Sequence, residues 1–181
     1  MIRCKWCNLK NEKYIEYHDK EWCKPNFDDK YLFEMLILES FQAGLSWECV
    51  LNKREDFRKA FDNFDVEKIC NYNDEKIQEL LRNEKIIRNK LKINATINNS
   101  KIFRKIQNEY GTFHNYLKTF TNDVIIYEID KTTNKLSDDL SKDLQKSGMK
   151  FVGSTIIYSY LQAIGIIYSH DKECFMYLYG L

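Results

Sequence analysis

The fold is decided by residues 32–47, LFEMLILESFQAGLSW, where an apolar run meets a turn. Asp28 or Asp29 can cap a helix that continues through Phe41, because an aspartate accepts hydrogen bonds from the free N–H groups of a helix start. The apolar side chains recur at helical spacing and form a wide apolar face. Residues 42–45 then interrupt the pattern. The stretch therefore predicts a buried helix that ends in a tight turn.

The rest of the chain is predicted to be helical as well. Ser46 can cap a helix that buries Trp47, and apolar spacing continues the pattern along the chain. Further helices are expected over residues 65–70, from 74, over 86–107, 111–120, 137–146 and 156–168. Residues 124–127, VIIY, are the exception, since they favour an extended segment. The predicted fold class is all-α.

The bulk properties indicate one folded domain, residues 1–181, built as two helical lobes that share a core. The hydrophobic share is 44%, which is enough for a packed interior, and one proline and six glycines disfavour sandwiches and barrels with many turns. No stretch approaches the roughly 18 consecutive apolar residues of a membrane span. Residues 1–24 lack the apolar region of a secretory signal. We expect a soluble, cytoplasmic protein without membrane contact, and a monomer.

Charge is distributed unevenly along the chain, although its net value is only +1. Residues 82–105 contain eight basic side chains against the single acid Glu84, a local charge of +7. Such a segment on an otherwise acidic body is typical of an element that faces phosphates, although a solvated lysine-rich helix would have the same composition.

Glu39 is the first candidate for a functional residue. It lies within or beside the apolar stripe of its helix, between Leu38 and Ser40. A buried carboxylate is costly unless it is paired, and such groups are enriched in functional sites. The alternative is a glutamate on the exposed stripe or one that caps a neighbouring loop.

Aromatic residues gather near the N-terminus: Trp6, Tyr14, Tyr17 and Trp22. Tyr14 and Tyr17 are three residues apart and share one face of a helix. Such side chains can form a core and nothing more. Together they can also enclose a planar base.

Six cysteines stand at positions 4, 7, 23, 49, 70 and 174. In an intracellular chain of this size, thiols or metal ligands are expected rather than disulfides. Cys49 and Cys70 lie in apolar stretches and are expected to pack.

Two sets of four residues can each complete a closed zinc site. The local set begins with a C-x2-C pair: Cys4, Cys7, His18 and Cys23. The other set joins distant segments through an H-x3-C pair: Cys4, His18, His170 and Cys174. The H-x3-C spacing puts both ligands on one face if that segment is helical. Spacing alone slightly favours the local set, and a chain without metal is a third alternative.

The order of these elements resembles the bacterial 3-methyladenine DNA glycosylases I over nearly the whole chain. The matching segments are RCKW (3–6), YIEYHDKEW (14–22), LFEM (32–35), LE (38–39), QAGLSW (42–47), VLNKRE (50–55), GMKFVGST (148–155), YS (158–159) and H-x3-C (170–174). The resemblance implies an all-helical fold of the helix-hairpin-helix glycosylase superfamily. It also implies one structural Zn²⁺ that joins the terminal segments through Cys4, His18, His170 and Cys174. The family pattern has no cysteines that match Cys7 and Cys23.

The resemblance further implies a pocket for a base flipped out of alkylated double-stranded DNA. Glu39 is the expected catalytic residue, and the expected substrate-binding residues are Trp6, Tyr14, Tyr17, Trp22, Trp47 and Ser159. Because 3-methyladenine is a cationic purine, it is already a good leaving group, and a carboxylate with aromatic faces can select it. The expected reaction is hydrolysis of the N-glycosidic bond, leaving an abasic site, with 3-methylguanine as a plausible second substrate.

The DNA-facing elements are also implied by the resemblance. Gly44 and Leu45 lie on the turn that approaches the space vacated by the flipped base, with Leu45 as an apolar wedge. The hairpin falls at residues 83–90, where Lys85, Arg88 and Lys90 are expected to grip phosphates. This hairpin contains no glycine, which many members of the superfamily have, and Glu109 is the only acid between residues 91 and 122. The alternatives are a non-catalytic DNA-damage-binding module on the same scaffold and a zinc-stabilised interaction domain.

Overall fold

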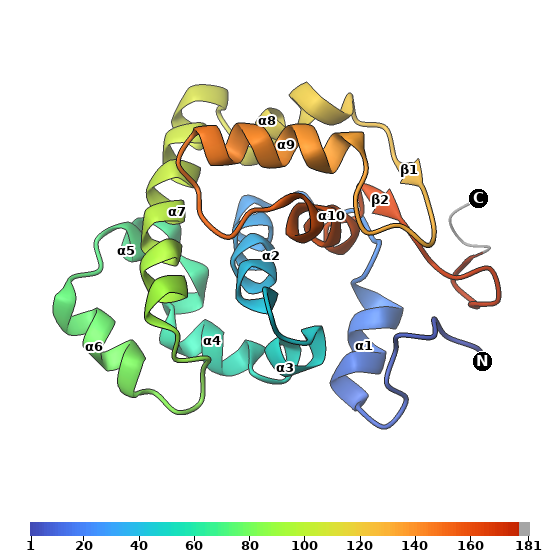
Figure 1. Cartoon of the computed structure of the whole chain (residues 1–181), viewed down its shortest axis with the longest axis horizontal. Coiled ribbons are helices and arrows are strands. Elements are labelled where there is room, and N and C mark those ends of the chain that lie inside the picture. The colour runs from blue at the N-terminus through green and yellow to red at the C-terminus, as the bar shows by residue number, and fades with distance from the viewer. Residues whose placement is uncertain (178–181) are drawn as a thin grey trace.

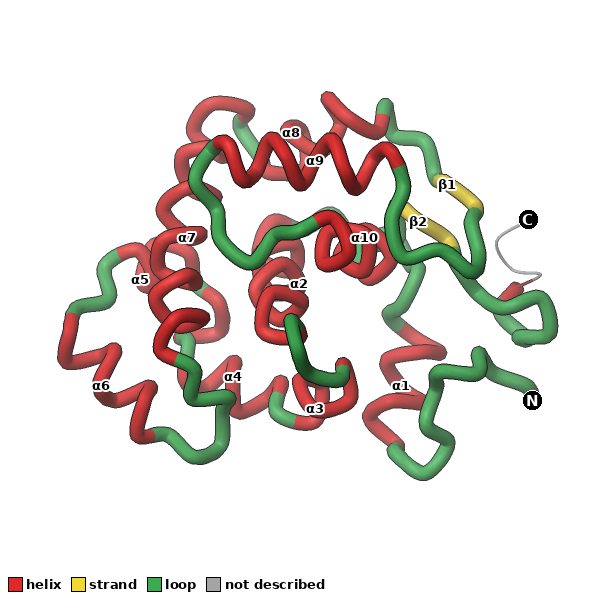
Figure 2. Tube along the Cα trace, viewed as in Figure 1, coloured by secondary structure: helices red, strands yellow, loops and turns green. Residues whose placement is uncertain are grey.

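The computed structural model describes residues 1–177 and is helical over most of its length (Figures 1 and 2). The α-helices in this part of the chain are α1 (Glu12–Lys20), α2 (Asp29–Gln42), α3 (Trp47–Asn52), α4 (Arg54–Ala60), α5 (Val66–Cys70), α6 (Asp74–Arg82), α7 (Lys90–Tyr110), α8 (Phe113–Thr121), α9 (Lys135–Lys146) and α10 (Ser154–Ala163). A short 3-10 helix, η1 (Asp62–Phe64), and two strands, β1 (Ile126–Tyr127) and β2 (Ile167–Tyr168), complete the description. The predicted helical fold class is confirmed.

Helix α2 lies at the centre of the molecule (Figure 1). All its residues from Leu32 to Phe41 are buried, and it packs against α10, α3, α7 and α8. Its start follows the expected chemistry, because the side chain of Asp28 accepts a hydrogen bond from the backbone N–H of Tyr31. With every face covered, α2 can carry polar groups such as Glu39 into the interior of the protein.

Helix α7 begins later than the apolar spacing predicted. The spacing placed its start at Ile86, but the helix starts at Lys90, and the side chain of Asn89 caps it. Ile86 is buried, although it lies in the loop that joins α6 to α7 and not in a helix. Residues 83–89 therefore form a real connection between two helices, and the predicted hairpin lies there.

The most apolar predicted helix, residues 156–168, is shorter than expected. Helix α10 ends at Ala163, and Gly165 follows with φ +80°. A Cβ on Gly165 would lie 2.3 Å from the carbonyl carbon of Lys24, so only glycine fits this close approach. The chain then enters β2, which pairs in parallel with β1, so the extended segment expected near residues 124–127 is present.

The N-terminal and C-terminal segments lie on the same side of the molecule (Figure 2). The backbone N–H of Phe175 donates to the carbonyl of Ile2 over 2.9 Å. The segment that contains His170 and Cys174 is irregular rather than helical. Among the described residues, no helix combines the length and the apolar character that crossing a membrane requires.

Candidate active site and metal centre

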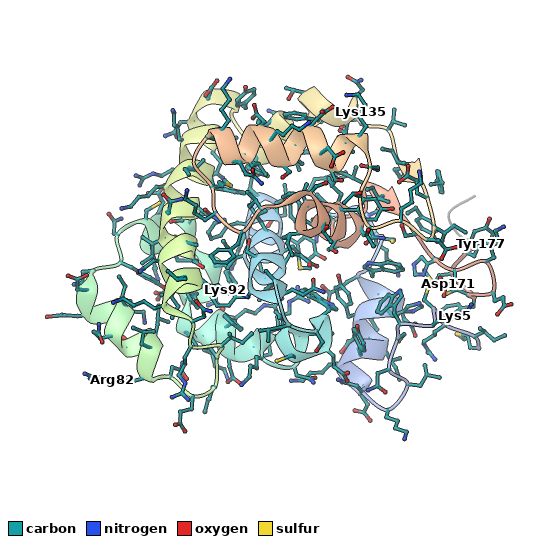
Figure 3. The ribbon with its side chains drawn as sticks, in the orientation of Figure 1. Lys5, Arg82, Lys92, Lys135, Asp171 and Tyr177 are labelled. Carbon is teal, nitrogen blue, oxygen red and sulfur yellow. The ribbon has the colours of Figure 1, made fainter. Side chains whose placement is uncertain are left out.

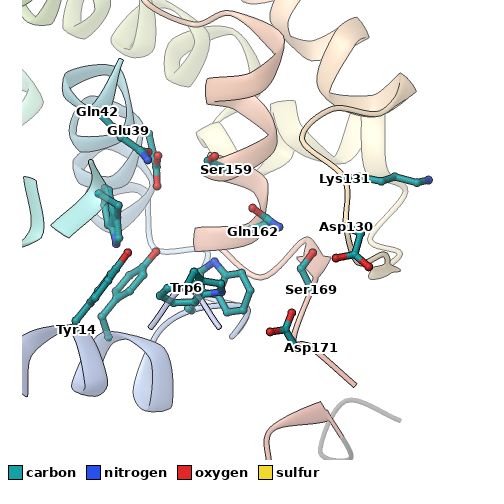
Figure 4. A pocket seen from close by; sticks show the side chains of 13 residues that line it. Trp6, Tyr14, Glu39, Gln42, Asp130, Lys131, Ser159, Gln162, Ser169 and Asp171 are labelled. Atoms are coloured by element: carbon teal, nitrogen blue, oxygen red, sulfur yellow. The ribbon is translucent and has the colours of Figure 1, made fainter. Parts of the chain in front are cut away.

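A cavity of about 320 Å³ opens between α1, α2, the start of α3 and α10 (Figure 4). All seven residues predicted for the base pocket line it: Trp6, Tyr14, Tyr17, Trp22, Glu39, Trp47 and Ser159. The structure thus brings together side chains that are up to 153 positions apart in sequence, from Trp6 to Ser159. Their individual roles stay predictions.

Glu39 is a buried polar group of the cavity. The residue is 3% exposed, and its Oε2 atom is buried without a hydrogen-bond partner among the described residues. Burial raises the pKa of its carboxyl group to about 8. A buried acceptor without a partner destabilises the empty protein, so the position is suited to a ligand that donates a hydrogen bond.

An aromatic wall faces Glu39 across the cavity. The ring centroid of Tyr17 lies 5.2 Å from that of Trp47, and the centroid of Trp6 lies 5.3 Å from that of Tyr14. Trp47 also buries its Nε1, which has no hydrogen-bond partner within residues 1–177. The cavity therefore offers flat apolar faces, an unpaired donor and an unpaired acceptor, which together suit a planar heterocycle with polar edges.

Most of the cavity residues that the sequence did not mark lie at its other end, which is polar. Six further residues line the cavity: Gln42, Asp130, Lys131, Ser169, Gln162 and Asp171. Figure 4 shows Glu39 and Gln42 at one end, and Asp130, Lys131 and Asp171 at the other. Gln42 could have been found from its position beside the predicted turn. The others come from loops and from α10, and no local pattern marks them.

Four side chains that could hold a metal ion meet where the terminal segments join. The donor atoms of Cys4, His18, His170 and Cys174 all lie within 4.8 Å of one another, and all four residues are buried. Sγ of Cys4 lies 3.4 Å from Nδ1 of His170, and Sγ of Cys174 lies 3.5 Å from Nε2 of His18. This is the set that the family resemblance implied.

The local set that spacing alone favoured is wrong. The thiol of Cys7 points to the carbonyl of Tyr14, and Sγ of Cys23 accepts a hydrogen bond from the backbone N–H of Ser169. Neither thiol belongs to the cluster. Cys70 is buried, as expected of a packing residue, and Cys49 is half-buried.

The surroundings of the cluster fit a metal ion. The backbone N–H groups of Asp171 and Met176 donate to the sulfurs of Cys4 and Cys174, which favours the thiolate form that binds metal. Nδ1 of His18 lies 2.8 Å from Asp19, so Nε2, which accepts a hydrogen bond from the backbone N–H of Cys4 over 3.3 Å, is the ring nitrogen that faces the cluster. Two sulfur and two nitrogen donors in a closed, buried arrangement match a structural zinc site.

The metal centre is in contact with the aromatic wall of the cavity. The ring centroid of Trp22 lies 4.7 Å from that of His170 and 4.6 Å from that of Trp6, both in edge-on geometry. Trp22 is thus packed between a metal-ligating residue and a cavity residue. A disturbance of the centre is therefore expected to reach the cavity.

The predicted DNA-facing residues lie on exposed turns. Gly44 has φ +78° and open space around it, and Leu45 is 43% exposed. Lys85, Arg88 and Lys90 are all exposed, and Arg88 makes only a long ion pair of 3.6 Å with Glu84. These side chains are available for contact with a phosphate backbone.

Two members of the basic segment are engaged elsewhere. Lys92 is buried against α2, and Arg104 forms an ion pair of 2.8 Å with Glu67. The +7 charge of residues 82–105 therefore does not form one continuous phosphate-facing surface, and its available part is concentrated near the hairpin.

Comparisons with known proteins agree with this geometry. The chain is 40% identical over 184 residues to DNA-3-methyladenine glycosylase 1 of Escherichia coli (strain K12), covering 98% of this chain and 97% of that protein. A crystal structure of 3-methyladenine DNA glycosylase I superimposes with a TM-score of 0.92 at 39% identity, covering 96% of this chain and 98% of that one. A structure from Staphylococcus aureus, solved to explain 3-methyladenine recognition, gives a TM-score of 0.90 at 32% identity over 96% of each chain.

The family assignment rests on the whole chain rather than on one motif. A model of the methyladenine glycosylase family matches residues 6–177, which include the aromatic wall, Glu39, the turn at Gly44 and three of the four metal-ligating residues. The resemblance seen in the sequence and the predicted fold are both confirmed. The chain belongs to the methyladenine glycosylase family.

Proposed function

We propose that the protein is a DNA glycosylase that removes 3-methyladenine from alkylated double-stranded DNA by hydrolysis of the N-glycosidic bond, leaving an abasic site. The observation that carries the proposal is the unpartnered, buried Oε2 of Glu39 in an aromatic cavity. The names of the relatives in Escherichia coli and Haemophilus influenzae support the same activity. A volume of about 320 Å³ lies within the range of ligand pockets.

Charge explains how such a cavity selects the damaged base. In the empty cavity Glu39 has a raised pKa of about 8, so near neutral pH the neutral carboxyl group predominates. A cationic purine in the cavity favours the carboxylate, because opposite charges attract strongly where water is excluded. An unmodified adenine carries no charge and does not receive this stabilisation. Glu39 thus reads the charge of the base and accepts a hydrogen bond from its edge.

The leaving group requires little further help. The positive charge of 3-methyladenine is neutralised when the glycosidic bond breaks, so the base departs without a strong general acid. Lys131 is the only lysine among the residues that line the cavity; it is 53% exposed, pairs with Glu128 over 3.0 Å, and lies at the end away from Glu39. An imine intermediate at that position is not favoured, and hydrolysis by water is the simpler reaction.

The remaining elements have supporting roles in this proposal. Leu45 fills the space that the flipped base leaves, Gly44 lets the turn approach the duplex, and Lys85, Arg88 and Lys90 bind phosphates. One Zn²⁺ held by Cys4, His18, His170 and Cys174 would be fully coordinated by protein, so it would stabilise the fold without activating water. The protein acts as a monomer and a single domain, with the base pocket between two helical lobes.

The activity is tested with dimethyl-sulfate-treated duplex DNA, from which the released bases are separated and identified. The wild-type protein should release 3-methyladenine, and 3-methylguanine release would define a broader substrate range. Glu39→Gln should lower the single-turnover rate about tenfold to hundredfold, the cost of one charge-assisted hydrogen bond. Glu16→Gln, an exposed carboxylate on α1, is the matched control and should not change the rate.

Release of no modified base by the folded wild-type protein would instead support the alternative, a DNA-damage-binding module without catalysis. An unchanged rate in Glu39→Gln would remove Glu39 from the proposed role while leaving the activity in place.

DNA binding by the hairpin is tested with Arg88→Ala. If Arg88 neutralises one phosphate, its loss reduces the slope of log affinity against log salt by about 1. The control is Lys142→Ala, which removes the same charge from the exposed face of α9. Equal slopes for Arg88→Ala and the wild type would show that this side chain does not contact the backbone.

A further inference from the structure

Lys92 differs from the other basic residues between positions 82 and 105, because it alone is buried, at 6% exposure. Its Nζ donates one hydrogen bond to the carbonyl of Phe41 over 2.7 Å and one to the carbonyl of Ala43 over 2.6 Å. The ring of Phe151 covers the ammonium group from 5.8 Å. Figure 3 shows Lys92 between α7 and α2, whereas Arg82 lies at the outer edge.

This position is unfavourable for α7 itself. Lys92 lies in the first turn of α7, where the positive end of the helix dipole repels a cation. Burial lowers the pKa of the ammonium group, and no ion pair with a carboxylate is recorded for it in the described part of the chain. The compensating interaction is on the other helix, because the carbonyls of Phe41 and Ala43 belong to the negative C-terminal end of α2.

The end of α2 that Lys92 holds connects the base pocket to the DNA-facing turn. Gln42, its last residue, lines the cavity, and the backbone N–H of Leu45 donates to the carbonyl of Gln42. On the other side, α7 follows directly after the hairpin with its exposed Lys85, Arg88 and Lys90. One buried ammonium group therefore joins the helix that follows the hairpin to the turn that carries Leu45.

We propose that Lys92 is a positioning residue for base extrusion: it fixes the turn that carries Leu45 relative to the hairpin that binds the phosphates. This inference rests on the proposed function. When the hairpin holds the DNA backbone, the hydrogen bonds of Lys92 determine how deeply Leu45 enters the stack of DNA bases. They also oppose displacement of Leu45 from that position. Lys92 touches neither the base nor the bond that breaks, so it acts through the turn alone.

A residue of this kind has a distinct experimental signature. Extrusion is costly in a duplex, where the base must leave its stack and its partner, and much less costly in a single strand. Loss of Lys92 should therefore slow excision from duplex DNA more than excision from denatured DNA. Binding of free 3-methyladenine, which needs no extrusion, should not change.

The test compares Lys92→Met with the wild type under enzyme excess, on a methylated oligonucleotide annealed at low temperature to its complement and on the same oligonucleotide left single-stranded as the denatured form. Heating is avoided because it would release the labile base without enzyme. Methionine keeps the unbranched shape and most of the length of the side chain, and it removes both hydrogen bonds. We expect a duplex rate lowered about tenfold to hundredfold and a much smaller change on denatured DNA. Tryptophan fluorescence should report unchanged binding of free 3-methyladenine, and Lys142→Met on α9 should match the wild type throughout.

An equal loss on duplex and denatured DNA would overturn the proposal, as would an unchanged duplex rate. Should Lys92→Met fail to fold, a double-mutant cycle of Lys92→Gln with Leu45→Ala decides, since coupled residues give non-additive effects. A Leu45→Ala loss that is smaller in the Lys92→Gln background supports the proposal, and strictly additive losses contradict it. Wild-type release of 3-methyladenine in the same assay separates these outcomes from a failure of the proposed function.

Discussion

The C-terminal end of α1 is held by two buried clusters that differ in what they depend on. His18 belongs to the four-residue metal centre, which reaches across the chain to His170 and Cys174. Glu21, three residues further on, pairs over 2.7 Å with Arg54, which also pairs with the buried Glu34. The first cluster depends on a remote segment and, as proposed above, on a bound zinc ion. The second requires only charges from the first third of the chain.

The difference matters because α1 carries Tyr14 and Tyr17 into the base pocket. A four-coordinate site loses most of its affinity for the metal when one ligand is removed, so the loss of any one ligand should abolish zinc binding. The ion-pair cluster has several contacts, and Arg58 also reaches Glu34 over 2.8 Å, so it should weaken in steps. Three variants test this comparison.

The largest effect is expected from His170→Ala. Loss of one ligand should abolish stoichiometric zinc binding and lower the free energy of unfolding by at least about 5 kcal/mol, since a structural zinc ion contributes directly to folding. Metal content and chemical denaturation measure both. Cys7→Ser, a cysteine outside the cluster, is the matched control and should retain one zinc per chain. Full zinc content in His170→Ala would disprove the assigned ligand set.

An intermediate effect is expected from Arg54→Met. The change leaves the buried carboxylate of Glu34 without its closest partner and should lower the free energy of unfolding by roughly 3 kcal/mol. Zinc content should stay at one per chain. Arg58→Met, which removes a more exposed partner of the same carboxylate, should cost about 1 kcal/mol or less. Loss of zinc from folded Arg54→Met would show that the two clusters do not act independently.

The smallest effect on stability is expected from Arg3→Met. Arg3 donates two hydrogen bonds, of 2.8 and 2.7 Å, to Asp19, which in turn contacts His18. Loss of this outer contact should weaken zinc affinity about tenfold in competition with a chelator, while the folded protein still binds one ion. Unchanged affinity would mean that Asp19 orients His18 without help from Arg3.

Helix boundaries set by neighbouring residues were more predictable than those set by contacts between distant segments. Asp28 and Ser46 accept the capping hydrogen bonds that their side chains suggested, because a cap depends on neighbours in sequence. The end of α10 depends instead on the approach of Lys24 to Gly165, a contact between distant segments. The start of α7 was misplaced because Ile86 fits the apolar spacing but packs from a loop, whereas the polar Asn89 marks the true start.

The residues of the candidate site also divide into those that the local sequence marks and those that depend on contacts between distant segments. Glu39 could be singled out because a carboxylate inside an apolar run is unusual, and the family resemblance supplied its aromatic neighbours. Spacing alone favoured the wrong metal ligands, because the H-x3-C pair does not show which distant residues complete its site. Lys92 was counted with the phosphate-facing lysines, since composition cannot distinguish a solvated ammonium group from one that holds the end of another helix.

The proposed metal centre would also determine the order in which the protein can be assembled. Cys4 and His170 are 166 positions apart, so the ligand set is incomplete until residue 174 has left the ribosome, and long-range closure of this kind is slow. A chain cut between α10 and His170 would keep the hairpin and the Lys92 contacts but lose two of the four ligands. Such a fragment would keep Lys85, Arg88 and Lys90, the side chains proposed to bind phosphates, while the cavity would lose the support of the terminal segments.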